Sequence, residues 1–498
     1  MEFDFKKLKD SGALNAQTAF QLALRAADQV ISHHRVHKPY AREAVALLCE
    51  MTADAEAARA GVAALFPSLI ERLNDSFDPR ACSLYDRVMA QVIDFYRRQP
   101  GGERLDGGLR SFGLTNEADL LQRKSYISSE DRTVRIEDRR TMRRVLLLSR
   151  VTIGADVAVT SVIIARLRDL LPNAEFVLIG SHKLRDLYGG DSRLRIREIA
   201  YDRTGGVLSR LNSWLDVVQV IDDENRQLKP EELLLIDPDS RLTQLGLLPL
   251  LRDERSYRFF ESRGFQRPGA GRLGELASLW VDDLLGASGR AFPYVALPEA
   301  HRKFGREMAE KMRRAGASHL VTVSLGVGGN PNKRLSDSFE SELIRHLLEE
   351  STLILDKGAS PEEREQINRI ITLLREQGKT IREVNEGNAA ELLQQEPIRT
   401  DVLTWDGGIG QFAGLIAAGD QYIGYDSAGQ HIAAALGVPV LTVFVNSNSP
   451  AFAERWRSYG SGVIKFLYID AEELKTNPGR ENTVLREIMA FPRQYRAK

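Results

Sequence analysis

Hydrophobic residues in the first 140 positions recur at three- and four-residue spacing, the period of an amphipathic helix. Three such series are Phe20, Leu24, Ala27 and Ile31; Ala44, Leu47, Leu48 and Met51; and Leu84, Val88 and Phe95. Asn15 precedes the first series and belongs to a residue type that caps helix N-termini. Because no alternating strand pattern is evident there, residues 1–140 are predicted to form an all-helical domain.

From Val145 the pattern changes to short, continuous apolar runs, which are typical of parallel strands buried on both faces. Helical segments separate most of these runs, which lie at 145–149, 175–180, 233–237, 320–324, 352–356, 421–425 and 440–445. The run at 320–324 and the Gly-rich turn after it begin a second series of strand, turn and helix. We therefore predict an α/β fold with two Rossmann-like domains, at 141–305 and 306–498, the second ending in a helix.

Composition narrows the class of protein. The chain has 498 residues, enough for about three domains, and 68 Lys and Arg against 69 Asp and Glu give a net charge of −1. This near equality of positive and negative charges argues against nonspecific nucleic-acid binding. No apolar run reaches the length of a membrane span, no signal peptide is evident, and only Cys49 and Cys82 are present. These features predict a cytoplasmic protein without a disulfide framework.

Ligands of open parallel sheets bind beyond the carboxyl ends of the strands, so the strand-end loops are the candidate sites. The first loop, SRVTIGADVAVT, places Asp156 at the start of a helix. An aspartate there is either an ordinary N-cap or a carboxylate base that faces the cleft and takes a proton from a hydroxyl. The absence of a GxGxxG motif argues against a nicotinamide enzyme.

Two further loops follow strands of the second domain. After Ser324, a Gly-rich loop leads to Lys333, which either reaches a phosphate or is simply solvated. After Asp426, the small residues Ser427, Ala428 and Gly429 open a helix that carries His431. Small residues at a helix N-terminus let a diphosphate approach the free N–H groups. The alternative is an Asp/Ser helix cap with a histidine packed beneath the sheet. The clustering of Asp, Ser, small residues and His within six positions favours a ligand site.

Other polar groups are weaker candidates. Asp237, Asp239 and Arg241 follow a strand end and are either a simple turn or an acceptor-side polar cluster. His33, His34 and His37 have no carboxylate or cysteine spaced to complete a metal site, so they are predicted to be a solvated helix end. No metal site is predicted.

The segment from Asp426 to His431, DSAGQH, with the following AAALGVP, resembles the Asp-Thr/Ser-Gly-x-x-His motif of glycosyltransferase family 9, the heptosyltransferases. Gly154-Ala155-Asp156-Val157 with Thr160 is similar to the family's Gly-Asp-Val followed by Thr. The chain departs from the family in two places: Ala428 stands at the motif's glycine, and Ala155 is an extra residue. The resemblance spans roughly 143–460 and leaves out the helical domain.

The resemblance implies a GT-B fold, with the acceptor on the first α/β domain and the donor on the second. It also implies that Asp156 is the catalytic base and that no metal is needed. The residues it places around the donor, together with the loop residues above, are Ser324, Lys333, Glu362 or Glu363, Asp426, Ser427, Ala428, Gly429 and His431.

The expected function is therefore an inverting, metal-independent glycosyltransferase that moves a sugar such as a heptose from a nucleotide diphosphate donor to an acceptor hydroxyl. No cofactor is expected beyond that donor substrate. The expected partners are the nucleotide sugar and a carbohydrate, glycolipid or other hydroxyl acceptor, with no nucleic acid and at most peripheral membrane contact. The helical domain is expected to mediate self-association or partner binding. The alternatives are a nucleotide-sugar hydrolase or epimerase of the same fold, and a nucleotide-sugar-binding scaffold without transfer activity.

Overall fold

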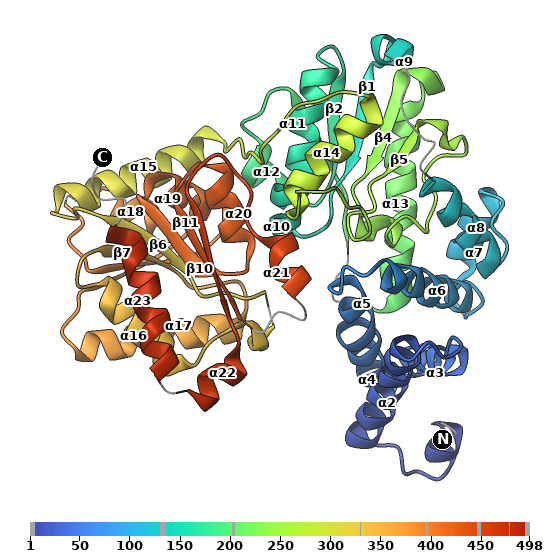
Figure 1. Ribbon diagram of the computed structural model, residues 1–498, viewed down its shortest axis with the longest axis horizontal. Helices are drawn as coiled ribbons and strands as arrows, with labels where there is room; N and C mark the ends of the chain where they lie inside the picture. Colours follow the sequence, from blue (N-terminus) through green and yellow to red (C-terminus); the bar gives the residue numbers. More distant parts are fainter. Residues whose placement is uncertain are drawn as a thin grey trace.

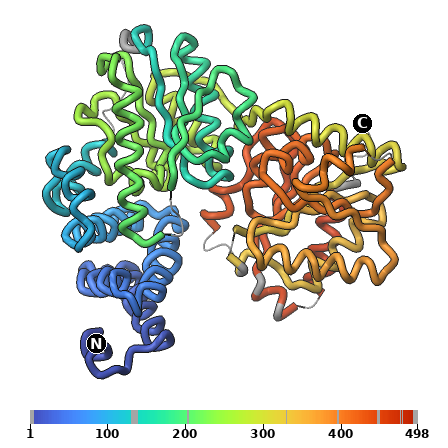
Figure 2. The backbone as a smooth tube through the Cα atoms, turned by 180° about the vertical axis from the view of Figure 1, so that it is seen from behind, coloured from blue at the N-terminus to red at the C-terminus, as the bar shows by residue number. Residues whose placement is uncertain are grey.

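The computed structural model describes residues 5–129, 136–201, 205–328, 330–394, 397–445, 450–477 and 479–493. A helical domain is followed by two α/β units that lie side by side (Figure 1). The helical domain packs against the first of these units, and the view from behind shows the same arrangement (Figure 2). The predicted architecture of two α/β domains after an all-helical one is confirmed.

The described part of the N-terminal domain contains helices and no strands. Asn15 caps α2 as predicted, because its side chain accepts hydrogen bonds from the backbone N–H groups of Gln17 and Thr18. The helices are α1 (Phe5–Asp10), α2 (Ala16–Arg35), α3 (Arg42–Ala53), α4 (Ala58–Ala63), η1 (Ala64–Glu71), α5 (Arg72–Asn74), α6 (Pro79–Tyr96), α7 (Glu103–Ser111), α8 (Glu117–Ile127) and α9 (Ile136–Thr141).

The first α/β unit holds a sheet of five parallel strands in the order β3-β2-β1-β4-β5. Its strands are β1 (Arg144–Leu148), β2 (Glu175–Gly180), β3 (Leu194–Glu198), β4 (Leu233–Asp237) and β5 (Tyr257–Phe259). Its helical elements are α10 (Ile153–Ala155), η2 (Asp156–Thr160), α11 (Ser161–Leu170), α12 (Lys183–Tyr188), α13 (Val207–Asn225), η3 (Pro230–Glu232), η4 (Arg241–Thr243), η5 (Glu254–Ser256) and α14 (Leu273–Leu285).

The second unit holds a sheet of seven parallel strands in the order β12-β11-β10-β6-β7-β9-β8. Its strands are β6 (Leu320–Ser324), β7 (Thr352–Asp356), β8 (Ile381–Asn385), β9 (Val402–Asp406), β10 (Gln421–Tyr425), β11 (Val440–Val445) and β12 (Ile464–Ile469). Its helical elements are α15 (Glu299–Arg314), η6 (Pro331–Lys333), α16 (Asp337–Leu347), α17 (Pro361–Glu376), α18 (Ala389–Leu392), α19 (Ile409–Ala418), α20 (Ala428–Ala435), α21 (Pro450–Trp456), α22 (Ala471–Thr476) and the predicted terminal helix α23 (Gly479–Arg493).

Helix α15 belongs to the second unit, because it packs directly on α19 at a pair of glycines. A Cβ atom on Gly305 would lie 1.9 Å from the carbonyl oxygen of Gly414. Two helices can approach this closely only where both lack side chains. The domain boundary predicted at 305 therefore falls inside α15.

The helical domain shares a hydrophobic core with the first α/β unit. Trp214 on α13 is fully buried, lies in the same cluster as Leu105 and Leu109 of α7, and meets the Phe112 ring at 5.9 Å between centroids. Burial of large aromatic side chains against a second domain fixes their relative position. In the described part of the chain, no helix is both long and apolar enough to cross a membrane.

Candidate functional site

Asp156 is the first residue of the π-helical turn η2 beyond β1 and is almost fully buried, with 1% of its surface exposed. Its carboxylate accepts hydrogen bonds from Ser149 Oγ at 2.6 Å, the Arg150 N–H at 2.7 Å and Thr160 Oγ1 at 2.9 Å. Burial raises the pKa of Asp156 to about 6, although these three donors act in the opposite direction. The carboxyl group is therefore ionised at neutral pH with a proton affinity suited to a general base.

Asp156 is not a helix N-cap. Thr152 is the N-cap residue, and the helix runs on from Ile153 through a π-helical turn that begins at Asp156. Val151, just before the helix, has a φ of +77°, which is strained for a β-branched residue. This conformation lets the Arg150 N–H point back to Asp156 and the Val151 N–H donate to Ser149 Oγ at 2.9 Å.

The loop that carries Asp156 lies directly against the N-terminus of α20 in the second unit. A Cβ atom on Gly154 would be 3.2 Å from Ala428 Cα and 3.5 Å from His431 Cδ2. The structure brings together the first and third loops that the sequence singled out.

Lys333 and Asp426 form an ion pair at the end of β10, with 2.7 Å between Nζ and Oδ2. The Lys333 side chain is 24% exposed and that of Asp426 is 11% exposed. Asp426 also accepts a hydrogen bond from Gln430 Nε2 at 2.7 Å. Asp426 therefore positions the ammonium group, and Lys333 remains partly open to solvent.

Ser427 is the N-cap residue of α20, but its hydroxyl makes no capping hydrogen bond, so the first N–H groups of the helix lack that partner. His431 is buried, and burial lowers the pKa of its imidazole to about 4, which keeps the ring neutral. Packing requires a glycine at position 429, because a Cβ atom there would lie 2.1 Å from the Tyr422 hydroxyl oxygen. Ala428 touches Gly154, as described above.

The remaining donor-side candidates are Ser324, the last residue of β6, and Glu362 and Glu363, which lie in the first turn of α17 after β7. Ser324 donates its hydroxyl to Asp356 Oδ2 at 3.0 Å. Glu363 is buried and accepts hydrogen bonds from four backbone N–H groups, those of Val327, Gly328, Ala359 and Ser360. Its carboxylate ties two loops together, whereas Glu362 is exposed in the first turn of α17. A nucleoside-binding role for either glutamate stays a prediction.

On the acceptor side, Asp237 is a buried centre of hydrogen bonds within its own domain. It accepts from the Ser240 N–H at 2.7 Å, Thr243 Oγ1 at 2.5 Å and the Tyr257 hydroxyl at 2.7 Å. Asp239 is also buried and pairs with Arg263 at 3.1 Å. Arg241 is partly exposed, and among the described residues it has no ion pair.

The structure adds residues of the helical domain that the sequence did not indicate. Asp75, which follows α5, is close enough to Lys333, Arg241 and Asp426 for their charges to affect its pKa, which burial raises to about 6. Phe77 meets Phe452 of α21 at 6.4 Å between ring centroids, and the Lys333 ammonium lies 4.7 Å from the Phe452 ring centroid. No motif marks these residues, because only the folded chain brings them to Lys333.

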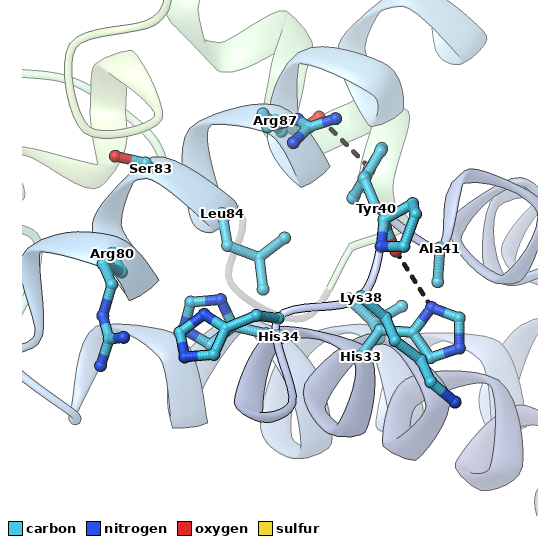
Figure 3. A pocket seen from close by; sticks show the side chains of 12 residues that line it. His33, His34, Lys38, Tyr40, Ala41, Arg80, Ser83, Leu84 and Arg87 are labelled. Atoms are coloured by element: carbon cyan, nitrogen blue, oxygen red, sulfur yellow. Dashed lines mark hydrogen bonds between the residues drawn. The ribbon is translucent and has the colours of Figure 1, made fainter.

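The three histidines near the end of α2 line a surface pocket of about 350 Å³ with Lys38, Arg80 and Arg87 (Figure 3). His33 Nδ1 lies 3.0 Å from the Pro39 carbonyl oxygen. Across the part of the chain that the structure describes, no three His, Cys, Asp or Glu side chains are grouped so that they could hold a metal ion. Cys49 and Cys82 are buried and free.

The sequence of the second α/β unit matches a known family profile. Residues 337–476 match the sequence profile of Glycosyltransferase family 9 (heptosyltransferase). That segment contains the motif from Asp426 to His431. A search among curated proteins finds no match.

Among solved structures, a family 9 glycosyl transferase from Veillonella parvula superposes with a TM-score of 0.50 at 14% identity, covering 71% of this chain and 97% of that one. The E. coli ADP-heptose lps heptosyltransferase II gives 0.46 at 17% identity, with 71% and 100% covered. The first likeness shows the GT-B fold. The profile match over residues 337–476 places the protein in the class of glycosyltransferases. The resemblance to family 9 is confirmed, with an additional helical N-terminal domain.

Proposed function

We propose that the protein is an inverting, metal-independent glycosyltransferase that moves a sugar from a nucleoside diphosphate to an acceptor hydroxyl. The observation that carries this proposal is the contact between Gly154 and Ala428. This contact brings the segment of the buried Asp156 against the open N-terminus of α20, next to which Asp426 holds the Lys333 ammonium group. A base and an anion-binding group thus meet across two domains.

Asp156 is the base of this reaction. The acceptor oxygen forms a bond to the anomeric carbon while the bond from that carbon to the diphosphate oxygen breaks. The acceptor proton passes to the Asp156 carboxylate, and the nucleoside diphosphate leaves with the bonding electrons. A carboxylate whose pKa is about 6 is ionised at pH 7 and still accepts a proton as the attacking oxygen loses it.

Lys333 and α20 stabilise the leaving diphosphate. The free N–H groups at the start of the helix and its dipole attract a phosphate, and the Lys333 ammonium adds a full positive charge. Burial keeps the His431 imidazole neutral, so it contributes a hydrogen bond rather than charge. Lys333 exchanges part of its contact with Asp426 for the phosphate when the donor binds.

The family resemblance points to ADP-heptose as the first donor to test. The purified full-length protein is incubated with ADP-heptose and other nucleotide sugars, each with and without a panel of sugar acceptors. Glycosylated product with an inverted anomeric centre by NMR, formed equally in EDTA, supports the proposal. Free sugar without an acceptor would identify a hydrolase, and tight nucleotide binding with no turnover would identify a scaffold.

Lys333→Ala tests the donor half of the site. Loss of a phosphate-binding cation is expected to lower kcat/KM about 100-fold, mainly through transition-state stabilisation. Lys303→Ala is the matched control, because Lys303 is an exposed lysine on α15 whose partner is Glu307 at 3.7 Å. Equal activity of the Lys333→Ala variant and the control would contradict this assignment.

A further inference from the structure

A pocket of about 540 Å³ lies between the helical domain and the first α/β unit. Arg59, Phe66 and Glu71 line it from α4 and η1, and Tyr201, Arg210 and Arg241 line it from the α/β side. The shared core around Trp214 holds the two walls in place. The volume falls in the range of small-molecule sites, roughly 300–1,000 Å³.

The described lining residues of the pocket carry more positive than negative charge, because they include three arginines and one glutamate. Arg210 lies over the Phe66 ring at 4.4 Å and donates from Nε to the Gly205 carbonyl at 3.1 Å, so its guanidinium is held in place. Arg59 and Arg241 have no ion pair within the described ranges of the chain. Two pocket arginines, Arg59 and Arg241, without a carboxylate partner among the described residues favour an anionic ligand.

Charged residues that line this pocket affect the pKa values of residues in and near the proposed donor site. Glu71 influences the pKa of Lys333, and Arg241 influences that of Asp75, which is in turn affected by Lys333 and Asp426. Arg241 also acts on Arg150, whose N–H donates to Asp156. Charges that line the pocket are thus close enough to Lys333, Asp75 and Arg150 to affect the pKa values of these groups.

We propose that this pocket binds an anionic group, a phosphate or carboxylate, carried by the sugar acceptor. The proposal rests on the proposed function and adds the chemical class of the acceptor. Arg241 and Arg59 pair with the anion, and the faces of Phe66 and Tyr201 pack against the sugar ring. The helical domain then takes part in substrate selection, since half of the pocket belongs to it.

The test separates this pocket from the donor site by using Lys333→Ala as the background. Glucose 6-phosphate, glucose and inorganic phosphate are titrated calorimetrically into the full-length protein. Glucose 6-phosphate is expected to bind about tenfold more tightly than either glucose or phosphate. Adding Arg241→Ala is expected to remove the tighter binding of glucose 6-phosphate. Arg59→Ala is expected to weaken it and serves as a second variant if Arg241→Ala folds poorly, because Arg59 is exposed.

Lys38→Ala is the matched control, because it removes one cation from the pocket in Figure 3, which shares no lining residue with this one. Loss of binding in the control but not in Arg241→Ala would overturn the proposal, as would equal binding of phosphate and glucose 6-phosphate.

Nucleotide affinity, measured with the wild-type lysine present, distinguishes the two proposals. If Arg241→Ala weakens nucleotide binding as much as sugar phosphate binding, the pocket belongs to the donor and the acceptor assignment is overturned. If no nucleotide binds any variant while glucose 6-phosphate still binds through Arg241, the anion pocket stands and the transferase proposal fails.

Discussion

The ends of β1 and β4 offer a comparison within one sheet. Asp237 is the last residue of β4, and Asp156 begins the π-helical turn η2 beyond β1. Each buried carboxylate accepts hydrogen bonds from a backbone N–H and two hydroxyl groups. Burial raises the pKa of both carboxyl groups. Each loop also holds non-glycine residues in the left-handed region, Val151 in one and Asp239, Gln244 and Leu245 in the other.

The difference lies in what surrounds the two carboxylates. The donors to Asp237 come from its own turn and from Tyr257 on the adjacent β5. Asp156 stands two residues after Gly154, the point of closest approach to α20 of the other unit. Burial, hydrogen bonding and backbone strain are therefore poor guides to function when taken alone. Position relative to the second α/β unit is what distinguishes Asp156, the candidate base, from Asp237.

The largest effect is expected for Asp156→Asn. The amide keeps the shape of the side chain and can still accept from the Arg150 N–H and donate to Ser149, so the protein is expected to fold. Because the amide cannot take up a proton, transfer is expected to fall about 10³-fold. Initial rates with saturating donor and acceptor measure this, and nucleotide titration is the control. A variant with wild-type rates would remove Asp156 from the mechanism.

Asp237→Asn is expected to show the reverse pattern. If the amide oxygen keeps the Ser240 N–H, the –NH2 group replaces the oxygen that accepts from both Thr243 and Tyr257, so two buried hydroxyl protons lose their acceptor. The free energy of unfolding is expected to fall by about 1–3 kcal/mol. Urea denaturation measures it. The rate per folded molecule is expected to stay within about twofold of the wild type, and a much larger loss would give Asp237 a part in the reaction.

The sequence predicted the layout of the fold because apolar runs and helical periodicity are local signals. It did not indicate β3, β5, β8, β9 or β12. The sequences of β3 and β8, LRIRE and IREVN, carry charges that an edge strand can leave in solvent. Phe20 was grouped with the core face of α2 but is 45% exposed, because that core is built from small residues such as Ala19, Ala23 and Ala26.

The site was predictable only as far as its motifs. The loops of Asp156 and His431 were found because each follows a strand, and their meeting follows from the two-domain fold. The interpretation of Asp156 as an N-cap was wrong, since Thr152 begins the helix. Asp75 could not be found, because its closeness to Lys333 depends on how the helical domain docks.

A third prediction uses pH to sharpen the comparison. Because Asp156 must be ionised to act as the base, the rate is expected to fall about tenfold per pH unit below an apparent pKa of about 6. The same ionisation affects stability, because the pKa of Asp156 in the folded protein lies above the value of 3.8 for a solvated aspartate. Its contribution to stability is therefore present below that value and is lost as pH rises towards 6. Asp156→Asn is expected to lack this loss. A pH–rate profile and urea curves from pH 4 to pH 7 measure the two effects, and a flat profile across pH 6 would contradict the assignment.

The smallest effect is expected for Thr160→Val, with Thr243→Val as its counterpart at the other carboxylate. Thr160 Oγ1 donates to Asp156 at 2.9 Å, a contact that lowers the pKa of this carboxyl group. Its loss is expected to move the acid limb of the pH–rate profile upward and to lower the rate at pH 6 about fivefold or less. Thr243 Oγ1 donates to Asp237, so Thr243→Val is expected to reduce the free energy of unfolding and to leave the acid limb of the pH–rate profile unchanged. An identical shift in both variants would mean that the acid limb reports the stability of the sheet rather than the ionisation of Asp156.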